Sequence, residues 1–251
     1  KYDVVFHFAA VANDPCTSLD PALSWSISCE SSYLLADSIL RAGSASRVIY
    51  ASSGSVYGIK QDERVTEELE LVPISTYNRA KIVSERIFLS FQDKLPIQIV
   101  RPATVCGLSP RMRLDVAVNM LTMQALKNGE ILVLGGDQYR PNIHIDDLTD
   151  LYIYLLDRPE LTGIYNAGFE NITILDIAKK ISEKIDSEIL ISESNDPRSY
   201  RQNSQKLLNT GFEQKYFVND AIEEIIEALN SGSLIENDQC YTVKWMKNLK
   251  L

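Results

Sequence analysis

The chain has 251 residues, of which 45% are hydrophobic and 24% charged, and this balance predicts a globular protein with one large or two smaller domains. Its formal net charge of −9 repels nucleic acid and anionic membranes, so neither is expected as a partner. No apolar run approaches the ~20 residues that a membrane-spanning helix needs, and no signal sequence opens the chain.

The cysteines and histidines argue against disulfides and a metal site. The four cysteines are widely spaced and form no CxxC pair, which favours a reduced, cytoplasmic protein whose thiols are small core residues. They are Cys16, Cys29, Cys106 and Cys240. Only two histidines occur, without an HxxxH or Cys/His cluster, so no metal site is expected. We interpret His7, inside an apolar run, as a buried structural histidine.

The first part of the chain alternates apolar runs with helical patterns. Val4–Ala10, Arg47–Ser53 and Ile97–Val105 have the apolar character of strands buried on both faces of a parallel sheet. Between them, Pro21–Arg41 has apolar residues at helical spacing, and a second helix begins near Tyr77. Strand, helix, strand, helix, strand with short connections predicts a doubly wound α/β sheet.

In such sheets the functional groups collect at the carboxyl ends of the strands. Ala9, Ala10, Ser53 and Thr104 fall at these ends, and the helix that carries Tyr77 begins near the same edge. The sequence therefore predicts a site along this edge of the sheet.

Beyond residue 107 the pattern is less regular and predicts a smaller α+β portion that packs on the sheet edge, with substrate in between. The expected helices are 111–128, 146–156, 173–185 and 219–229, and the expected strands or extended segments are 131–134, 142–145 and 163–167. We therefore assign 1–107, with parts of 137–168, to a sheet portion, 108–136 and 169–231 to a substrate-binding portion, and 232–251 to a tail of unassigned structure.

Tyr77 and Lys81 are four residues apart on the predicted helix, so their side chains project from the same face one turn apart. A lysine ammonium beside a phenol favours its ionised form, as an enzyme that transfers a hydride from an alcohol requires. A YxxxK pair also occurs often by chance, so this interpretation depends on the surrounding motifs.

Six short motifs occur in order along the chain: His-Phe-Ala-Ala (7–10), Ser-Ser-Gly-Ser-Val-Tyr-Gly (52–58), Tyr-Asn-Arg-Ala-Lys (77–81), Arg-Pro-Ala-Thr-Val-Cys-Gly (101–107), Arg-Pro-Asn-Ile-His-Ile-Asp-Asp-Leu (140–148) and Tyr-Asn-Ala-Gly (165–168). Together they resemble the extended short-chain dehydrogenase/reductases, and within these the NAD-dependent epimerase/dehydratase family that acts on nucleotide sugars. The resemblance runs from about residue 3 to about residue 230. It implies a Rossmann-like sheet.

The resemblance implies roles for individual residues. Tyr77 would be the catalytic acid/base, Lys81 would hold the nicotinamide ribose and lower the pKa of Tyr77, and Ser53 would hydrogen-bond the reacting sugar oxygen. The cofactor-binding set would be Phe8, Ala9, Ala10, Tyr77, Lys81, Arg101 and Pro102. The implied cofactor is NAD, with NADP left open, and the implied partner is a nucleotide-sugar substrate.

Substrate binding would fall to Ser53 and Thr104 and to a set of arginines, since a guanidinium binds phosphate bidentately. These are Arg111, Arg113, Arg140, Arg198 and Arg201. Arg111 and Arg113 lie in Ser-Pro-Arg-Met-Arg-Leu-Asp (109–115), which resembles a motif of sugar 4-dehydrogenases and epimerases. The alternative for each arginine is a solvated or ion-paired side chain.

The chain departs from the family pattern in three ways. The GxxGxxG phosphate loop is absent, so we expect the first βαβ unit to be missing and the chain to be a fragment. Gly54-Ser55 stands where the dehydratases of the family have an acid and a base, which disfavours dehydration. Ser28 and Thr104 replace two asparagines that are frequent in the family, which leaves the substrate open.

The function indicated is NAD-dependent oxidation and reduction at a ring carbon of a nucleotide-activated sugar, with C4 the leading candidate, by a 4-epimerase or a net dehydrogenase/reductase. A homodimer through the helices around 21–42 and 77–94 is expected. The alternative is a non-catalytic or truncated scaffold that binds no cofactor.

Overall fold

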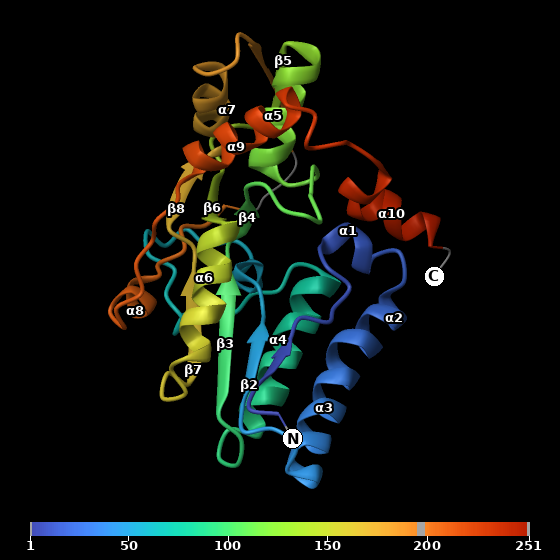
Figure 1. Ribbon diagram of the computed structural model, residues 1–251, viewed down its shortest axis with the longest axis vertical. Coiled ribbons are helices and arrows are strands. Elements are labelled where there is room, and N and C mark those ends of the chain that lie inside the picture. The colour runs from blue at the N-terminus through green and yellow to red at the C-terminus, as the bar shows by residue number, and fades with distance from the viewer. Residues whose placement is uncertain (1, 195–198, 250–251) are drawn as a thin grey trace.

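The centre of the molecule is a sheet of four parallel strands in the order β1-β2-β3-β7, seen in a computed structural model that describes residues 2–194 and 199–249 (Figure 1). The strands are β1 (Val5–His7), β2 (Val48–Ala51), β3 (Ile97–Pro102) and β7 (Gly163–Ala167). Apolar side chains alternate between its two faces. Val48 and Tyr50 of β2 belong to one core cluster, and Ile49 belongs to another.

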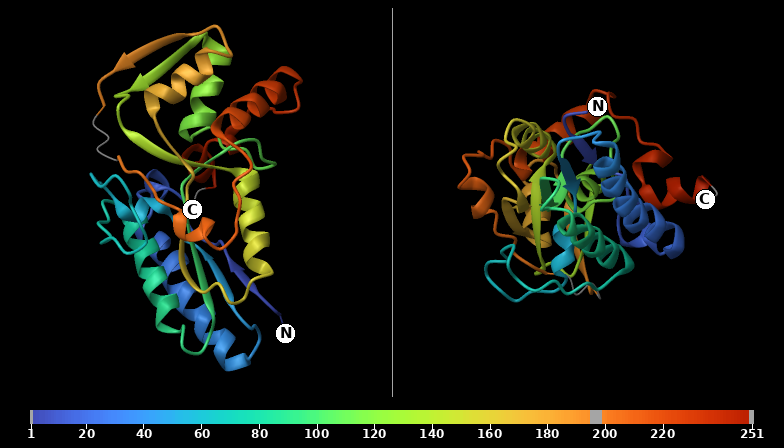
Figure 2. Two further views of the ribbon diagram at one scale, coloured as in Figure 1. Left: turned by 90° about the vertical axis from the view of Figure 1, so that its left-hand side faces the viewer. Right: turned by 90° about the horizontal axis from the view of Figure 1, so that it is seen from below.

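Helices cover both faces of this sheet (Figure 2). One face packs against α3 (Ser31–Ala42) and α4 (Thr76–Ser90), and the other packs against α6 (Ile145–Leu156). Ahead of α3 lie α1 (Asp14–Thr17), α2 (Pro21–Trp25) and a π-helical turn, Ser26–Glu30. The doubly wound α/β architecture is therefore confirmed, although the helix expected over 21–41 is interrupted by the π turn.

A smaller α+β portion lies beyond the carboxyl ends of the strands. Its core joins α5 (Ala117–Asn128), α7 (Ile174–Ser182) and α9 (Val218–Asn230) to a parallel strand pair, β5 (Glu130–Leu134) and β9 (Glu188–Ser192). A second sheet connects the two portions through β4 (Thr104–Cys106), β6 (Tyr139–His144) and β8 (Glu170–Thr173). A short helix, α8 (Gln205–Leu208), packs against the four-stranded sheet.

Several segments differ from the expectations. The helix expected from residue 111 begins only at Ala117, because the Asn119 side chain bonds the backbone of Gly107 and Arg113 and holds the preceding loop. Strands β8 and β9 had no clear sequence signal. The tail contains a 3₁₀ turn, Asp238–Cys240, and α10 (Thr242–Asn248), which packs on α1. None of the described helices is both long and apolar enough to cross a bilayer.

Strand β1 forms one edge of the four-stranded sheet in the part of the chain that the structure describes, since it pairs there with β2 alone. Next to this edge, Phe6 and Phe8 are 37% and 54% exposed. Their rings lie 5.6 Å apart between centroids, and Phe8 lies 4.8 Å from Tyr152 of α6. The edge therefore presents backbone polar groups beside aromatic side chains.

Candidate active site

A cavity of about 810 Å³ lies at the carboxyl ends of β2 and β3, between the two portions. Ser53, Tyr77 and Thr104 line it from the sheet side, as the strand-end argument predicted. Arg113 and Arg140 line it from the smaller portion. The cleft therefore brings hydroxyl groups and guanidinium groups to one space.

Tyr77 lies in the first turn of α4, in the wall of the cleft. Ser75 caps this helix: its Oγ accepts a hydrogen bond from the Asn78 N–H at 3.1 Å and donates one to Asp14 at the start of α1. Ser53, at the end of β2, lies close enough to the phenol of Tyr77 to lower its pKa. The first turn of α4 is thus held against the start of α1, with the phenol near the end of β2.

Burial raises the pKa of Tyr77 above its ordinary value of 10, against the smaller lowering effects of Ser53 and Arg113. This direction differs from the expectation that Lys81 would lower this pKa. The reason is geometric. The Lys81 Nζ lies 5.9 Å from the centroid of the Tyr77 ring and donates a hydrogen bond of 2.7 Å to the carbonyl of Ala51.

Lys81 is itself buried, and its Nζ also lies 5.0 Å from the centroid of the Tyr50 ring. Burial lowers the pKa of Lys81 to about 8, while the carboxylate of Glu85 acts in the opposite direction. An ammonium has three donors, and the structure shows one of them on Ala51. The remaining donors make Lys81 a candidate for binding hydroxyl groups.

A hydrogen-bonded network that the sequence analysis did not identify supports Ser53. The Ser53 and Ser55 hydroxyls are 2.8 Å apart, and the Asn78 side-chain amide donates to Ser55 Oγ at 2.9 Å. Asn13, another residue of the cleft wall, is the one described non-glycine residue with a positive φ, at 68°. Backbone strain of this kind concentrates at functional sites. The motifs gave no indication of Asn13.

Arg101 does not line the cleft, contrary to its predicted role in cofactor binding. Its buried guanidinium forms hydrogen bonds of 2.9 and 2.7 Å to the two carboxylate oxygens of Glu85, and a third of 2.7 Å to the Tyr57 hydroxyl. Pro102, by contrast, lines the cleft. We therefore interpret Arg101 as part of the structural support under the site.

The remaining residues assigned to the cofactor follow β1. Phe8, Ala9 and Ala10 leave the carboxyl end of this strand toward the cleft, whose wall begins at Ala12. The Phe8 side chain packs on Tyr152. His7 is buried, as predicted, and its Nε2 lies 3.2 Å from the Ser32 hydroxyl.

The arginines assigned to the substrate separate into two groups. Arg111, Arg113 and Arg140 line the cleft, and the Arg113 Nε donates to Asp115 at 2.9 Å. Arg201 is outside the cleft wall, with its guanidinium 4.0 Å from the centroid of the Tyr139 ring. Arg198 lies outside the described residues.

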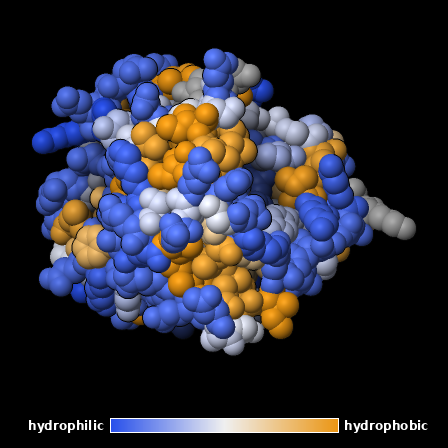
Figure 3. All heavy atoms as spheres, turned by 90° about the horizontal axis from the view of Figure 1, so that it is seen from above, coloured by the Kyte–Doolittle hydropathy of each residue, from blue (hydrophilic) through white to orange (hydrophobic). Residues whose placement is uncertain are grey.

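The cleft also has an apolar wall. Figure 3 shows hydrophobic side chains gathered at the end of the molecule that carries the smaller portion. Exposed leucines of β5 and β9 are Leu132, Leu134 and Leu190, and the first two line the cleft. The cavity can therefore accommodate an apolar group as well as an anion.

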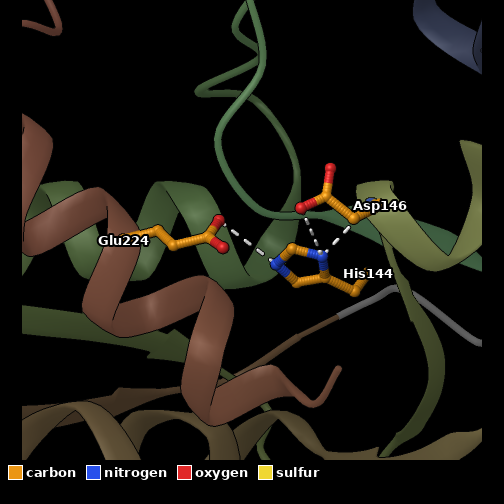
Figure 4. A group of neighbouring side chains, drawn as sticks. All are labelled: His144, Asp146 and Glu224. Atoms are coloured by element: carbon orange, nitrogen blue, oxygen red, sulfur yellow. Dashed lines mark hydrogen bonds and ion pairs between the residues drawn. The ribbon is translucent and has the colours of Figure 1, made fainter. Parts of the chain in front are cut away.

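His144, Asp146 and Glu224 form the one group in residues 2–194 and 199–249 whose composition suits a metal ion (Figure 4). The Asp146 N–H donates to His144 Nδ1 at 3.2 Å, so Nε2 carries the proton and donates to Glu224, also at 3.2 Å. The two carboxylates lie at opposite ends of the imidazole ring. This geometry favours a hydrogen-bonded link between α6 and α9 over a metal centre.

Comparison with known proteins identifies the family to which the chain belongs. The family model described as the NAD dependent epimerase/dehydratase family matches residues 1–168. The chain is 30% identical over 189 residues to an uncharacterised UDP-glucose epimerase of Bacillus subtilis, covering 72% of this chain and 58% of that protein. It is 28% identical over 190 residues to UDP-arabinose 4-epimerase 1 of Arabidopsis thaliana, and the match covers 66% of this chain and 45% of that protein.

The chain spans about half the length of the curated relatives that it matches. Among solved structures, UDP-glucuronic acid 4-epimerase of Bacillus cereus, in complex with UDP-glucuronic acid and NAD, superposes with a TM-score of 0.80 at 24% identity, over 91% of this chain and 76% of that chain. UDP-glucose 4-epimerase of Thermotoga maritima, with UDP-glucose, superposes with a TM-score of 0.81 at 22% identity, over 92% of this chain and 78% of that chain. These two likenesses establish the fold.

Because the family model covers most of the sequence, the chain belongs to the NAD-dependent epimerase/dehydratase family of extended short-chain dehydrogenase/reductases.

Proposed function

We propose that this chain is the catalytic part of an NAD-dependent enzyme that oxidises and reduces C4 of a nucleotide-linked sugar. The observation that carries the proposal is the meeting of Ser53 and Tyr77 in the wall of one cleft, with the buried Lys81 one helical turn further along α4 and its Nζ 5.9 Å from the centroid of the Tyr77 ring. UDP-sugars are the first substrates to test, because the named relatives include UDP-sugar 4-epimerases.

The residues at the sheet edge fit the nicotinamide half of NAD. Lys81 offers a buried ammonium to ribose hydroxyls, and the Pro102 segment supplies a wall of the cleft. NAD, when bound there, would exchange a hydride with the sugar carbon. We propose that the pyrophosphate of NAD is held by a segment outside these 251 residues, since no GxxGxxG loop occurs within them. NADP remains equally compatible with the residues present.

Proton transfer falls to Tyr77. As a phenolate it removes the proton of the sugar hydroxyl, and as a phenol it returns it. Because burial raises the pKa of Tyr77, the phenolate needs stabilisation by the Ser53 hydroxyl and the positive charge of Arg113. Ser53 also lies where its hydroxyl could donate to the oxygen of the developing carbonyl.

Recognition of the diphosphate falls to the arginines of the cleft. Arg111, Arg113 and Arg140 gather positive charge in a protein whose formal net charge is −9. Guanidinium groups bind phosphate oxygens bidentately, which makes this cleft suited to a sugar nucleotide. Thr104, half-buried at the start of β4, lines the same cleft, and we propose that it contacts the sugar.

Two outcomes of the chemistry are compatible with the cleft. A 4-epimerase must let the keto sugar rotate in the site, so that the hydride returns to its other face. A net dehydrogenase or reductase needs no such rotation. Dehydration is disfavoured because Gly54-Ser55 supplies no acid and base pair beside Ser53. The match to 4-epimerases supports the first outcome as the leading proposal.

The test is an assay of the complete protein with NAD and UDP-glucose, UDP-glucuronic acid or UDP-arabinose, following the 4-epimer and NADH. Tyr77→Phe should lower turnover by roughly 10³-fold and leave binding of NAD and UDP intact. Tyr33→Phe, on the exposed face of α3, is the matched control and should retain activity. An inactive wild-type protein that binds no NAD would instead support a non-catalytic scaffold.

We also propose a homodimer through the helices around 21–42 and 77–94. Three large apolar side chains of this surface are exposed, namely Trp25, Tyr33 and Leu34, the last by 61%. An apolar helix surface of this kind is typical of an interface between subunits.

A further inference from the structure

The tail that follows α9 returns from the smaller portion to the sheet portion. It turns at Gly232, where φ is 73°, passes through the 3₁₀ turn Asp238–Cys240 and ends in α10, which lies beside α1 (Figure 1). Both portions border the cleft, so the tail spans from one wall to the other.

Two hydrogen bonds join the tail to the loop that carries the cleft arginines. The Leu114 N–H donates to the Cys240 carbonyl at 2.8 Å. The Thr242 N–H donates to Asp115 Oδ2 at 2.9 Å. Thr242 is the first residue of α10, so Asp115 caps the tail helix from a segment that is distant in sequence.

The same carboxylate also contacts an arginine of the cleft. Asp115 Oδ1 accepts the hydrogen bond from Arg113 Nε. One aspartate therefore joins the start of α10 to Arg113, each through its own oxygen. An Nε–H held in this way leaves the two NH₂ groups of the guanidinium for other partners, and Arg113 lines the cleft.

Two further contacts place the tail at the site. Val243, the second residue of α10, lines the cleft together with Asn13 and Asp14 of the segment around α1. A separate cavity of about 250 Å³ lies between the end of α10 and the α1–α2 segment, lined by Cys16 and Met246 among others. The tail is thus held at its start by Asp115 and packs less closely toward its end.

We propose that residues 237–249 form a strap that positions Arg113 through Asp115 and bounds the cleft with Val243, so that the strap determines affinity for the anionic part of the substrate. The inference rests on the proposed function, because it takes that anion to be the diphosphate of a nucleotide sugar. Asp115 and Thr242 are positioning residues in this scheme, and Arg113 is the residue that binds.

The test removes one hydrogen bond without removing the helix. Proline has no N–H but is well tolerated at the first position of a helix, so Thr242→Pro deletes the donor to Asp115 while α10 can still form. The preceding residue, Tyr241, has an extended backbone (φ −119°, ψ 101°), outside the α region that a following proline disfavours. Thr242→Val keeps both the N–H and the side-chain shape and is the matched control.

Steady-state kinetics of the complete protein with UDP-glucose and NAD, with calorimetric binding of UDP, measures the effect. We expect Thr242→Pro to raise KM and the UDP dissociation constant by roughly tenfold, because losing a hydrogen bond to the carboxylate that holds Arg113 weakens the binding of the anion. The effect on kcat should be smaller, since it arises only from the charge that Arg113 places near Tyr77. Thr242→Val should match the wild type. Asp115→Asn, which leaves the helix backbone unaltered, should shift KM in the same direction.

Wild-type affinity in both Thr242→Pro and Asp115→Asn would overturn the strap, as would a fall in kcat at unchanged KM. These results would leave the proposed function standing. Failure of the wild-type protein to bind UDP or to turn over any UDP-sugar would overturn the proposed function, and the strap with it.

Discussion

Acid should destabilise this protein through His7, and replacement of His7 should remove that effect. The Ser32 hydroxyl donates to the Ser28 carbonyl at 2.6 Å and therefore accepts from His7 Nε2–H. The imidazole also packs between the rings of Tyr50 and Phe88, with centroids 5.6 and 5.5 Å away. A charged imidazole has no anionic partner among these neighbours.

Burial, followed by the charge of Lys81, lowers the pKa of His7 from 6.5 to about 4. The unfolded chain therefore binds a proton at a higher pH than the folded chain does. The stabilising effect of the neutral imidazole is fully present above pH 6.5 and is lost as the pH falls through 4. The free energy of unfolding falls by about 3 kcal/mol in total, at about 1.36 kcal/mol for each unit by which the pKa is lowered. About 2 kcal/mol of this decrease occurs between pH 7.5 and 5.0.

The assay is urea unfolding of the complete protein at pH 7.5 and 5.0, for the wild type and for His7→Phe. Phenylalanine retains the aromatic packing, and Ser32 keeps its bond to the Ser28 carbonyl. The wild type should lose about 2 kcal/mol more than the variant between the two pH values. Equal losses in both proteins would refute the assignment of a lowered pKa to His7.

Three other predictions concern stability and assembly. Glu85→Gln should cost about 3–5 kcal/mol of unfolding free energy in urea titrations, because it leaves the Arg101 guanidinium buried without its anion; a loss below 1 kcal/mol would contradict this. Gly107→Ala should lower the melting temperature, since φ is +104° and the new Cβ would lie 2.8 Å from His144 Nε2. Leu34→Glu should convert a dimer into a monomer in sedimentation experiments, and an unchanged mass would exclude this surface as the interface.

The parts of the fold that the sequence predicted are those determined by local pattern. The continuous apolar run of β2 predicted a strand buried on both faces, and the structure places Val48 and Tyr50 in one core cluster and Ile49 in the other. Tyr77 and Lys81 are one helical turn apart, so their shared face also follows from local geometry. Convergence of strand ends at one edge then placed Ser53 near them.

The parts that could not be predicted depend on contacts between distant segments. Nothing local shows that Arg101 would bond Glu85 instead of reaching the cleft, since the pairing depends on how α4 packs on β3. Asp115 and Thr242 are 127 residues apart, and their bond determines the position of the tail. The strands β8 and β9 are short, β8 is half-buried and β9 is mostly exposed, so their sequences lack the pattern that marks a buried strand.

The open edge at β1 has a practical consequence for these 251 residues produced on their own. An unpaired strand edge is a template for another strand, and the exposed rings of Phe6 and Phe8 add a hydrophobic surface beside it. Two copies could pair edge to edge, which would lead to concentration-dependent aggregation without any unfolding. Lysine substitution at Phe6 or Phe8 is the natural way to keep such a preparation monodisperse.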